Sequence, residues 1–318
     1  MEPRRARLTR LLLLSVISLP ITACSTAAPA TLRPPSSPAA AAAAACANAP
    51  TQVKTPGQIT FSTTDPAYEP WFEDDPDVQY AVEPSDAPKW HVTDPYSMHG
   101  FESGVVYSIA DSMGFAPEAV RWVPNTRDAA LAPGDKNFDV FIGQVAIPDG
   151  DSTAVDFSEE YLESVQSIVA QRTNPIVSAK TIADLKAYRL GAIGSSASPA
   201  LVTNVIAPTT PVQTYLDEVT AVAAMRRGDI DGFVTDLATA FFQINGPGSG
   251  DPAPLPDGVV FGKFAPTVWV DHLGVVLQKG SPLTPCVNAA IEAIRANGSL
   301  DEFQNEDIPV GEDVPTFQ

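Results

Sequence analysis

The segments TIADLKAYRLGAIGSS (181–196) and VTAVAAMRRGDIDGFVTDLATAFFQI (219–244) decide the fold class. In the first, Thr181 and Asp184 have the spacing of a capping box for a short helix, and an apolar strand then ends in small hydroxyl residues. In the second, a helix closes at Gly228 and a strand passes directly into another helix. Alternating strands and helices predict an α/β architecture with largely parallel sheets.

The flanking sequence continues this alternation. Strands are expected at QITFSTT (58–64), AVRWVP (119–124), FDVFIGQVAI (138–147) and HLGVVLQKGSP (272–282). The run 100–115 predicts a helix that ends at Gly114, and 283–298 predicts an amphipathic helix. A last short helix is expected after a cap formed by Ser299 with Glu302, and residues 246–258 read as a loop rich in Gly and Pro.

The composition limits the classes of partner. The chain has 318 residues, is 44% hydrophobic and carries a formal charge of −19. That length allows one large domain or two of ordinary size. A surface this acidic repels phosphate backbones and anionic membranes, so nucleic-acid binding is excluded.

The N-terminus predicts export. Arg4, Arg5, Arg7 and Arg10 precede the apolar run LLLLSVISLPI, which is too short to span a bilayer permanently. The sequence ITAC (21–24) that follows resembles a bacterial lipobox, which implies cleavage after Ala23 and a lipid on Cys24. We therefore expect residues 1–23 to be a signal peptide and the protein to be anchored at the extracytoplasmic face of the cell membrane. An ordinary secretory signal with an incidental Cys is the alternative.

Residues 24–51 are rich in Ala, Pro, Ser and Thr, and they predict a mobile tether. The remaining cysteines, Cys46 and Cys286, form an even pair in an oxidising compartment. They suggest a disulfide that pins the end of the tether to the C-terminal helix, with two free thiols as the alternative.

An aromatic loop is followed by seven motifs in one order. An aromatic and Pro-rich loop, TDPAYEPWFEDD (64–75), precedes Gly-Phe-acid at 100–102, and the later motifs are FDV (138–140), VDFSEEY (155–161), the segments around 183–196 and 224–236, GVVLQKGSPL (274–283) and NGSLDEF (297–303). Across residues 57–305 this order resembles the family 3 solute-binding proteins, the polar-amino-acid receptors of ABC importers. The aromatic loop, the IGQ at 142–144 and the Cys pair resemble an actinobacterial lipoprotein branch.

The resemblance implies a periplasmic-binding-protein fold of type II. Each of its two lobes would hold a mixed, mostly parallel sheet, with lobe I at 52–163 and 267–318 and lobe II at 164–266. Two crossover strands would hinge the lobes, and the ligand would lie at the carboxyl ends of the strands. It also implies a monomer that delivers a small ligand to a permease and its ATPase, and needs no cofactor.

The turn before VDFS departs from the family pattern. The family places there an Arg that pairs with the ligand's α-carboxylate, and an ungapped count puts Asp151 at that position. A carboxylate ligand would then meet a carboxylate, at a cost of several kcal/mol at an effective dielectric of about 20. Two alternatives stay open: Pro148 and Gly150 remodel the turn so that Asp151 faces solvent, or Arg127 supplies the missing positive charge.

The other expected ligand contacts come from matching family positions. Asp236 would face the ligand's amine, although a helix N-cap role alone would also explain it. Ser195 and Ser196 would donate hydrogen bonds, and Gln144 and Ala146 stand at a strand end. Tyr68, Trp71 and Phe72 would form an aromatic wall, which Trp90 of the insert 78–99 could join; core packing of Trp71 and Phe72 is the alternative.

These residues suggest a cationic or amine-bearing ligand without a free α-carboxylate near Asp151, because aromatic faces and carboxylates attract cations. An ordinary amino acid bound through Arg127 is the alternative, as is a lipoprotein that senses a ligand without transport. Some members of the fold are dehydratases, but His91, His99 and His272 lack the context of a nucleophile, and no GxSxG is present. Neither an enzyme nor a metal site is therefore expected.

Overall fold

A computed structural model describes residues 37–73, 82–246, 252–308, 311 and 313–318. Residues 35–318 form one compact unit. The expected signal peptide, Cys24 and part of the insert 78–99 lie outside the described residues. Within the described part, no helix is both long and apolar enough to cross a membrane.

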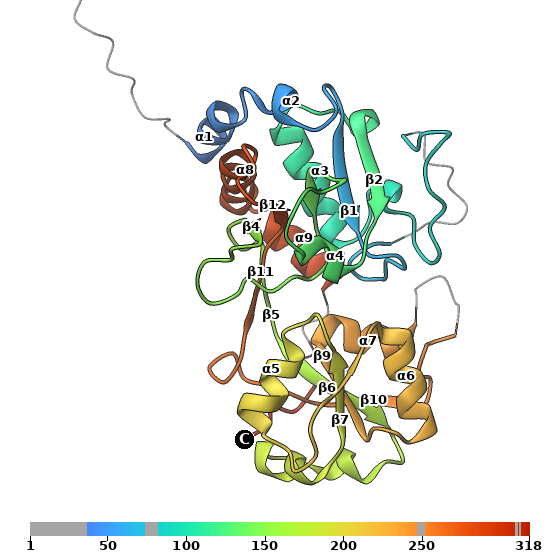
Figure 1. The fold of residues 1–318 in the computed structure, drawn as a ribbon. Coiled ribbons are helices and arrows are strands. Elements are labelled where there is room, and N and C mark those ends of the chain that lie inside the picture. The colour runs from blue at the N-terminus through green and yellow to red at the C-terminus, as the bar shows by residue number, and fades with distance from the viewer. Residues whose placement is uncertain (1–36, 74–81, 247–251, 309–310, 312) are drawn as a thin grey trace, which may run out of the picture. The chain divides into compact units, whose positions relative to one another are not determined.

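The first lobe is built on a five-stranded sheet (Figure 1). Its strands, in spatial order, are β2 (Val120–Pro124), β1 (Ile59–Thr63), β3 (Val140–Phe141), β12 (Val276–Gln278) and β4 (Val155–Phe157). The helices α3 (Phe101–Ser112), α8 (Thr284–Ala296) and α9 (Ser299–Asp307) pack on one another, and α4 (Arg127–Leu131) follows β2.

The second lobe has its own five-stranded sheet. Its order is β10 (Gly258–Lys263), β6 (Gln166–Gln171), β9 (Gly232–Asp236), β7 (Leu190–Ile193) and β8 (Gln213–Tyr215). Along β6, Ile168 and Ala170 belong to one buried cluster and Val169 to another, so both faces of the sheet are covered. The covering helices are α5 (Ser198–Leu201), α6 (Glu218–Arg227) and α7 (Leu237–Asn245).

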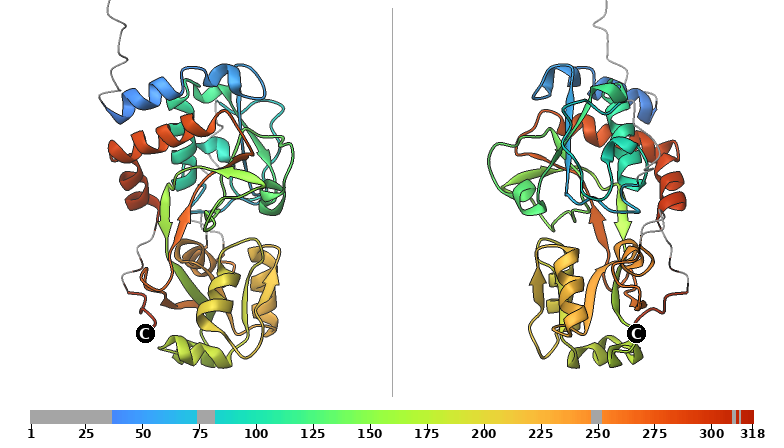
Figure 2. Two further views of the ribbon diagram at one scale, coloured as in Figure 1. Left: turned by 60° about the vertical axis from the view of Figure 1, so that its left-hand side comes forward. Right: turned by 90° about the vertical axis from the view of Figure 1, so that its right-hand side faces the viewer.

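Two antiparallel strands, β5 (Leu162–Ser164) and β11 (Asp271–Leu273), connect the lobes (Figure 2). Strand β5 leads from β4 of the first sheet to β6 of the second, and β11 leads back from β10 to β12. The strands next to these crossovers, β4, β6, β10 and β12, form antiparallel pairs. Strand β1 pairs in parallel with β2 and β3, and β7 pairs in parallel with β8 and β9. The two-lobed α/β fold is confirmed, with sheets that are more mixed than expected.

Short helical turns complete the lobes, at Pro95–Ser97, Pro117–Ala119, Pro175–Ser178, Ile182–Ala187 and Val202–Ile206. The expected capping box of Thr181 with Asp184 is present, and Gly228 closes α6 in the left-handed conformation with φ of 78°. The expected cap at Ser299 is wrong. Gly298 occupies the N-cap position of α9, and no side-chain cap bond forms.

The tether prediction is wrong for its second half. Residues Pro38–Ala45 form helix α1, a short helix α2 (Ala49–Gln52) follows, and α1 lies beside α8 (Figure 2). Pro38 is tolerated because it stands in the first turn, and alanine has the highest helix propensity. The predicted disulfide between Cys46 and Cys286 is present, and it holds this segment on the first lobe.

The end of the chain also departs from the expected partition. Residues 267–318 were assigned to lobe I, but Thr316 bridges Lys263 of β10, and Phe317 packs against Phe261 and Phe264. The last residues therefore return to the second lobe, because the aromatic ring of Phe317 fills its core.

Candidate functional site

Two adjoining pockets open between the lobes at the carboxyl ends of strands. The first, which we call the inner pocket, has a volume of about 20 Å³, which is room for roughly one water molecule. The second, the outer pocket, encloses about 550 Å³ and shares Arg127, Gln144, Ile193 and Glu218 with the first. The polar lining of the inner pocket comes from both lobes: Arg127, Gln144, Ser164, Gln166, Ser196, Ser198, Glu218, Thr235, Asp236 and Asp271.

Arg127 is the cationic group of both pockets, and it is 9% exposed. Thr126 caps α4, so the side chain of Arg127 leaves from the first turn of that helix. Its Nε donates to the carbonyl oxygen of Gly143 at 3.0 Å, and its Nη2 donates to Oε1 of Gln144 at 3.4 Å. Within the described residues, no carboxylate oxygen lies within 4.0 Å of this guanidinium. A buried charge without a close ion-pair partner is costly, and Arg127 interacts with the carboxylates of Glu102, Glu218 and Asp236 only over a longer range.

The buried carboxylate of Glu102 holds Gln144, a residue that accepts a hydrogen bond from Arg127, in place. The backbone N–H of Gln144 donates to Oε1 of Glu102 at 2.8 Å, the side-chain amide of Gln144 donates to Oε2, and the hydroxyl of Tyr161 donates to Oε1 at 2.5 Å. Gln144 adopts a left-handed backbone with φ of 50°, three residues after β3 ends at Phe141. Burial raises the pKa of Glu102 to about 7, against the lowering effect of these hydrogen bonds and of Arg127.

Two carboxylates face Arg127 from the second lobe. Asp236 ends β9 and caps α7, because its Oδ1 accepts from the backbone N–H of Thr239 at 2.7 Å. Glu218 stands in the first turn of α6. Burial raises the pKa of both carboxyls, and Arg127 partly offsets that rise. Desolvated carboxylates of this kind attract an ammonium group.

The outer pocket is mainly acidic. Its lining includes Asp65, Asp128, Asp217 and Glu218 together with Arg127. Asp65 also accepts from His91 of the insert, with 2.6 Å between Oδ2 and Nδ1. A cationic group is therefore favoured there over an anionic one.

At the base of the cleft, polar side chains join the crossover strands to the second lobe. Nε2 of Gln166 donates to Oδ2 of Asp271 at 2.6 Å, and the hydroxyl of Ser198 donates to Oε1 of Gln166 at 2.8 Å. The indole of Trp269 donates to Oδ1 of Asp271 at 2.8 Å. The network keeps these buried groups paired, as buried polar groups require.

In addition to Asp236, five of the residues predicted from the sequence line the inner or the outer pocket. Tyr68 lines the outer pocket, Gln144 lines both, Ala146 and Ser196 line the inner one, and Ser195 lines the outer one. The ring of Tyr68 lies 5.1 Å from that of Phe242 in α7, and its buried hydroxyl has no partner among the described residues. Ser196 donates instead to the carbonyl of Ile193, so its hydroxyl is partly used inside the loop.

The other three aromatic assignments need correction. Trp71 and Phe72 are buried in the core of the first lobe, where Trp71 packs against Phe101 and Phe72 against Trp122. Trp90 of the insert also packs against that core, and none of the three lines the inner or outer pocket. The insert brings His91 to the rim of the cleft instead, through its contact with Asp65.

The assignment of Asp151 to the ligand site also needs correction. Its side chain is exposed, and it lines neither the inner nor the outer pocket. Gly150 turns the backbone with φ of 88°, and the hydroxyl of Ser152 accepts from the N–H groups of Ala154 and Val155. The turn leaves Asp151 on the surface, and Arg127 is the cationic side chain that lines the inner and outer pockets.

The sequence did not predict the roles of Asp65, Glu102, Asp217 and Glu218 at this site. Glu102 had a usable signal, since an acid in the first turn of an apolar helix that is otherwise buried demands a partner. Glu218 had a weaker one, because an acid at the start of a helix is ordinarily explained by the helix dipole. Only the packing of α6 against the cleft distinguishes the two roles.

The fold and the cleft define a two-lobed binding protein with a polar site between its lobes. The sequence profile of the bacterial extracellular solute-binding proteins, family 3, matches residues 78–306. The chain belongs to this family.

Three curated relatives are named for different amino acids. The chain is 26% identical over 220 residues to the glutamate-binding protein GluB of Corynebacterium efficiens, covering 67% of this chain and 70% of the relative. It is 25% identical over 245 residues to an L-arginine-binding protein of Pseudomonas aeruginosa, covering 74% and 90%. It is 23% identical over 211 residues to a probable histidine-binding protein of Neisseria gonorrhoeae, covering 65% and 74%.

Solved structures agree in fold. An ancestral arginine-binding protein bound to arginine aligns with a TM-score of 0.58 at 23% identity, over 80% of this chain and 99% of that one. The arginine-, lysine-, histidine-binding protein ArtJ of Geobacillus stearothermophilus aligns with a TM-score of 0.58 at 19% identity, over 79% and 95%. At these identities the likeness establishes the two-lobed fold alone.

Proposed function

We propose that this protein is the receptor of an ABC importer and captures an α-amino acid between its lobes. Arg127 pairs with the α-carboxylate, and Asp236 pairs with the α-ammonium group. The observation that carries this proposal is the buried guanidinium of Arg127, which has two hydrogen bonds to the protein and no ion-pair partner among the described residues. A carboxylate can meet the free face of a guanidinium in bidentate fashion.

The ligand's side chain is cationic in this proposal. It enters the outer pocket, where the carboxylates of Asp65, Asp217 and Glu218 stand near the buried hydroxyl of Tyr68. Two of the three relatives are named for basic amino acids and one for glutamate, so the acidic lining of the outer pocket is what favours a basic ligand. The ligand in this proposal still carries a cationic group, as the sequence suggested, but it also has a free α-carboxylate. Arg127 pairs with that carboxylate, and Asp151 has no part in the site.

The delivery of the ligand follows from the same proposal. Lobe I (52–163 and most of 267–318) and lobe II (164–266) close by hinge motion about β5 and β11, and a permease recognises the closed form. A lipid on Cys24 holds the monomeric receptor at the membrane. Replacement of Cys24 by Ser should release the protein from the membrane fraction, and retention there would refute the anchor.

A thermal-shift screen tests the ligand class. The wild-type chain is heated with each of the twenty amino acids, and with amines and quaternary ammonium compounds. A ligand at a hundred times its dissociation constant adds about 2.7 kcal/mol of stability. We expect basic amino acids to raise the midpoint, and Arg127→Gln to abolish the rise. Stabilisation by none of the twenty amino acids would overturn the proposal.

A further inference from the structure

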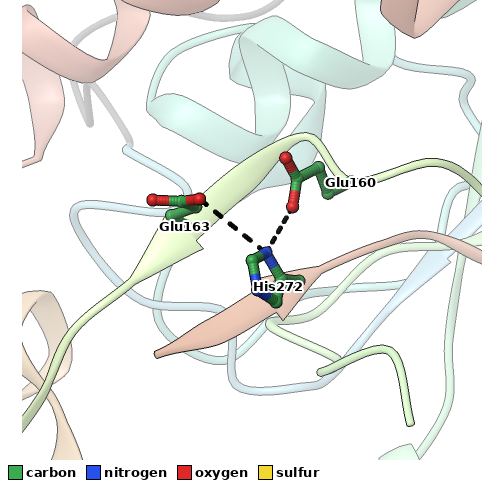
Figure 3. A group of neighbouring side chains, drawn as sticks. All are labelled: Glu160, Glu163 and His272. Carbon is green, nitrogen blue, oxygen red and sulfur yellow. Dashed lines mark hydrogen bonds and ion pairs between the residues drawn. The ribbon is translucent and has the colours of Figure 1, made fainter. Parts of the chain in front are cut away.

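A second cluster of polar side chains lies on the crossover strands, apart from the residues of the inner and outer pockets. Glu163 of β5 stands directly opposite His272 of β11 in the antiparallel register. Glu160 precedes β5, and its Oε2 contacts Nδ1 of His272. Oε1 of Glu163 lies 4.0 Å from the same nitrogen. Figure 3 shows both carboxylates directed at the imidazole ring.

We propose that Glu160, Glu163 and His272 bind a divalent transition-metal ion, with Zn²⁺ as the best-fitting example. The three ligand atoms lie within 4.8 Å of one another. One imidazole nitrogen and two carboxylate oxygens form a donor set that Zn²⁺ accepts, and water fills the fourth position. Mg²⁺ and Ca²⁺ fit poorly, because they take oxygen ligands and more of them.

The two carboxylates of the cluster, on Glu160 and Glu163, give it an excess of negative charge that attracts a cation. Two carboxylates share one imidazole, and within the described residues no lysine or arginine lies within 4.0 Å of either carboxylate. A divalent ion bound to a neutral imidazole neutralises both.

The backbone of the cluster is already fixed. The N–H of Tyr161 donates to the carbonyl of Leu273 at 2.8 Å, and the N–H of Ile147 donates to the carbonyl of His272 at 2.8 Å. Arg295 donates to the carbonyl of Glu160. Only side-chain torsions must change to seat the ion, and these side chains are between 40% and 63% exposed, so they are free to turn.

The site lies on both strands that connect the lobes, so a bound ion would affect how firmly they are held together. Glu163 lies on the strand that leaves the first lobe, and His272 lies on the strand that returns to it (Figures 1 and 3). An ion held by both residues joins the two connections between the lobes. Zn²⁺ should therefore raise the unfolding midpoint, independently of any amino-acid ligand.

Isothermal titration of the full chain with ZnCl₂ in chelator-treated buffer tests the proposal, with a thermal-shift series beside it. We expect saturable binding of one Zn²⁺ per chain and a raised midpoint. His272→Ala and the conservative Glu163→Gln should each weaken binding roughly tenfold or more, in line with what metal sites lose on smaller perturbations. His91→Ala is the matched control, because His91 is also exposed and paired with a carboxylate, Asp65.

Two results would overturn the proposal. One is the absence of saturable binding to the wild-type chain, which would leave an ordinary ion pair. The other is equal binding by the wild-type chain and Glu163→Gln, which would place the zinc elsewhere on the acidic surface. Because neither readout requires an amino acid, this test succeeds or fails separately from the proposed receptor function.

Discussion

The indole nitrogen of Trp71 donates a hydrogen bond to the hydroxyl of Thr239 at 3.2 Å. Trp71 lies in the loop after β1, and Thr239 lies in the first turn of α7, so the bond joins the two lobes. Ala238 of α7 packs into the core of the first lobe at the same place. The aromatic loop thus contacts the second lobe directly, although it does not form the ligand wall expected of it.

Thr239→Val tests this contact between the lobes. Valine keeps the volume but removes the acceptor, which leaves the buried indole N–H of Trp71 unpaired at a cost of about 1–3 kcal/mol. We expect weaker binding of a basic amino acid in calorimetry. Thr239→Ser keeps the hydroxyl and should bind more tightly than the valine variant; equal affinities of the two variants would contradict the role of the bond.

Asp236→Asn separates the two roles of Asp236. Asparagine caps helices about as well as aspartate, so the free energy of unfolding should change by less than about 0.5 kcal/mol. The loss of the charge should weaken amino-acid binding by about 2–5 kcal/mol, because a buried charge pair is broken. Urea unfolding and calorimetry measure the two effects. If binding stays intact in this variant, Asp236 is a cap and nothing more.

Asp151→Ala should leave binding unchanged. The side chain is exposed and lies outside the inner and outer pockets, and surface changes of this kind stay within about 0.5 kcal/mol, or roughly twofold in affinity. The measurement is the dissociation constant of the same amino acid. A change of affinity well beyond twofold would return Asp151 to the site.

Glu102 should make stability depend on pH. Its pKa rises from 4.5 to about 7 in the folded protein. The folded state therefore holds a proton that the unfolded state releases, so this carboxyl favours folding most below about pH 4.5, and that contribution is lost as the pH rises through about 7. The full difference is about 3 kcal/mol.

Glu102→Gln removes the titrating group, so the slope of unfolding free energy between pH 5 and pH 8 should flatten. Urea unfolding at the two pH values measures the slope. The control is Glu292→Gln, because Glu292 is exposed and its ion pair among the described residues is with Arg295. An identical slope in wild type and Glu102→Gln would show that other groups cause the pH dependence.

The strand and helix order was predictable because its signals are local. The capping box at Thr181 and the closing Gly228 depend on neighbours in sequence, and both are present as expected. Helix α1 was not predicted because it is stabilised by α8, which is far away in the sequence, and by the disulfide between Cys46 and Cys286. The same holds for Phe317, whose core position depends on Phe261 and Phe264.

The candidate site was predictable only in part. Asp236, Tyr68 and Gln144 were predicted from the positions they match in the family that the sequence resembles, and all three line the pockets. The exposed position of Asp151 and the place of Arg127 in both pockets do not follow from the sequence, because they depend on the turn at Gly150 and on the hydrogen bond of Arg127 to Gly143. The prediction for Asp151 assumed that the turn at 148–151 has the same geometry as in the family, and in this turn the side chain of Asp151 is exposed.

The most direct test of the central claim compares L-arginine with agmatine, its decarboxylated analogue, by isothermal titration of the wild-type chain. If Arg127 reads the α-carboxylate, L-arginine binds far more tightly, because agmatine leaves the buried guanidinium unpaired. Arg127→Gln should then remove most of the difference. Binding of agmatine as tight as that of L-arginine would contradict the account and restore a cation without a carboxylate as the ligand.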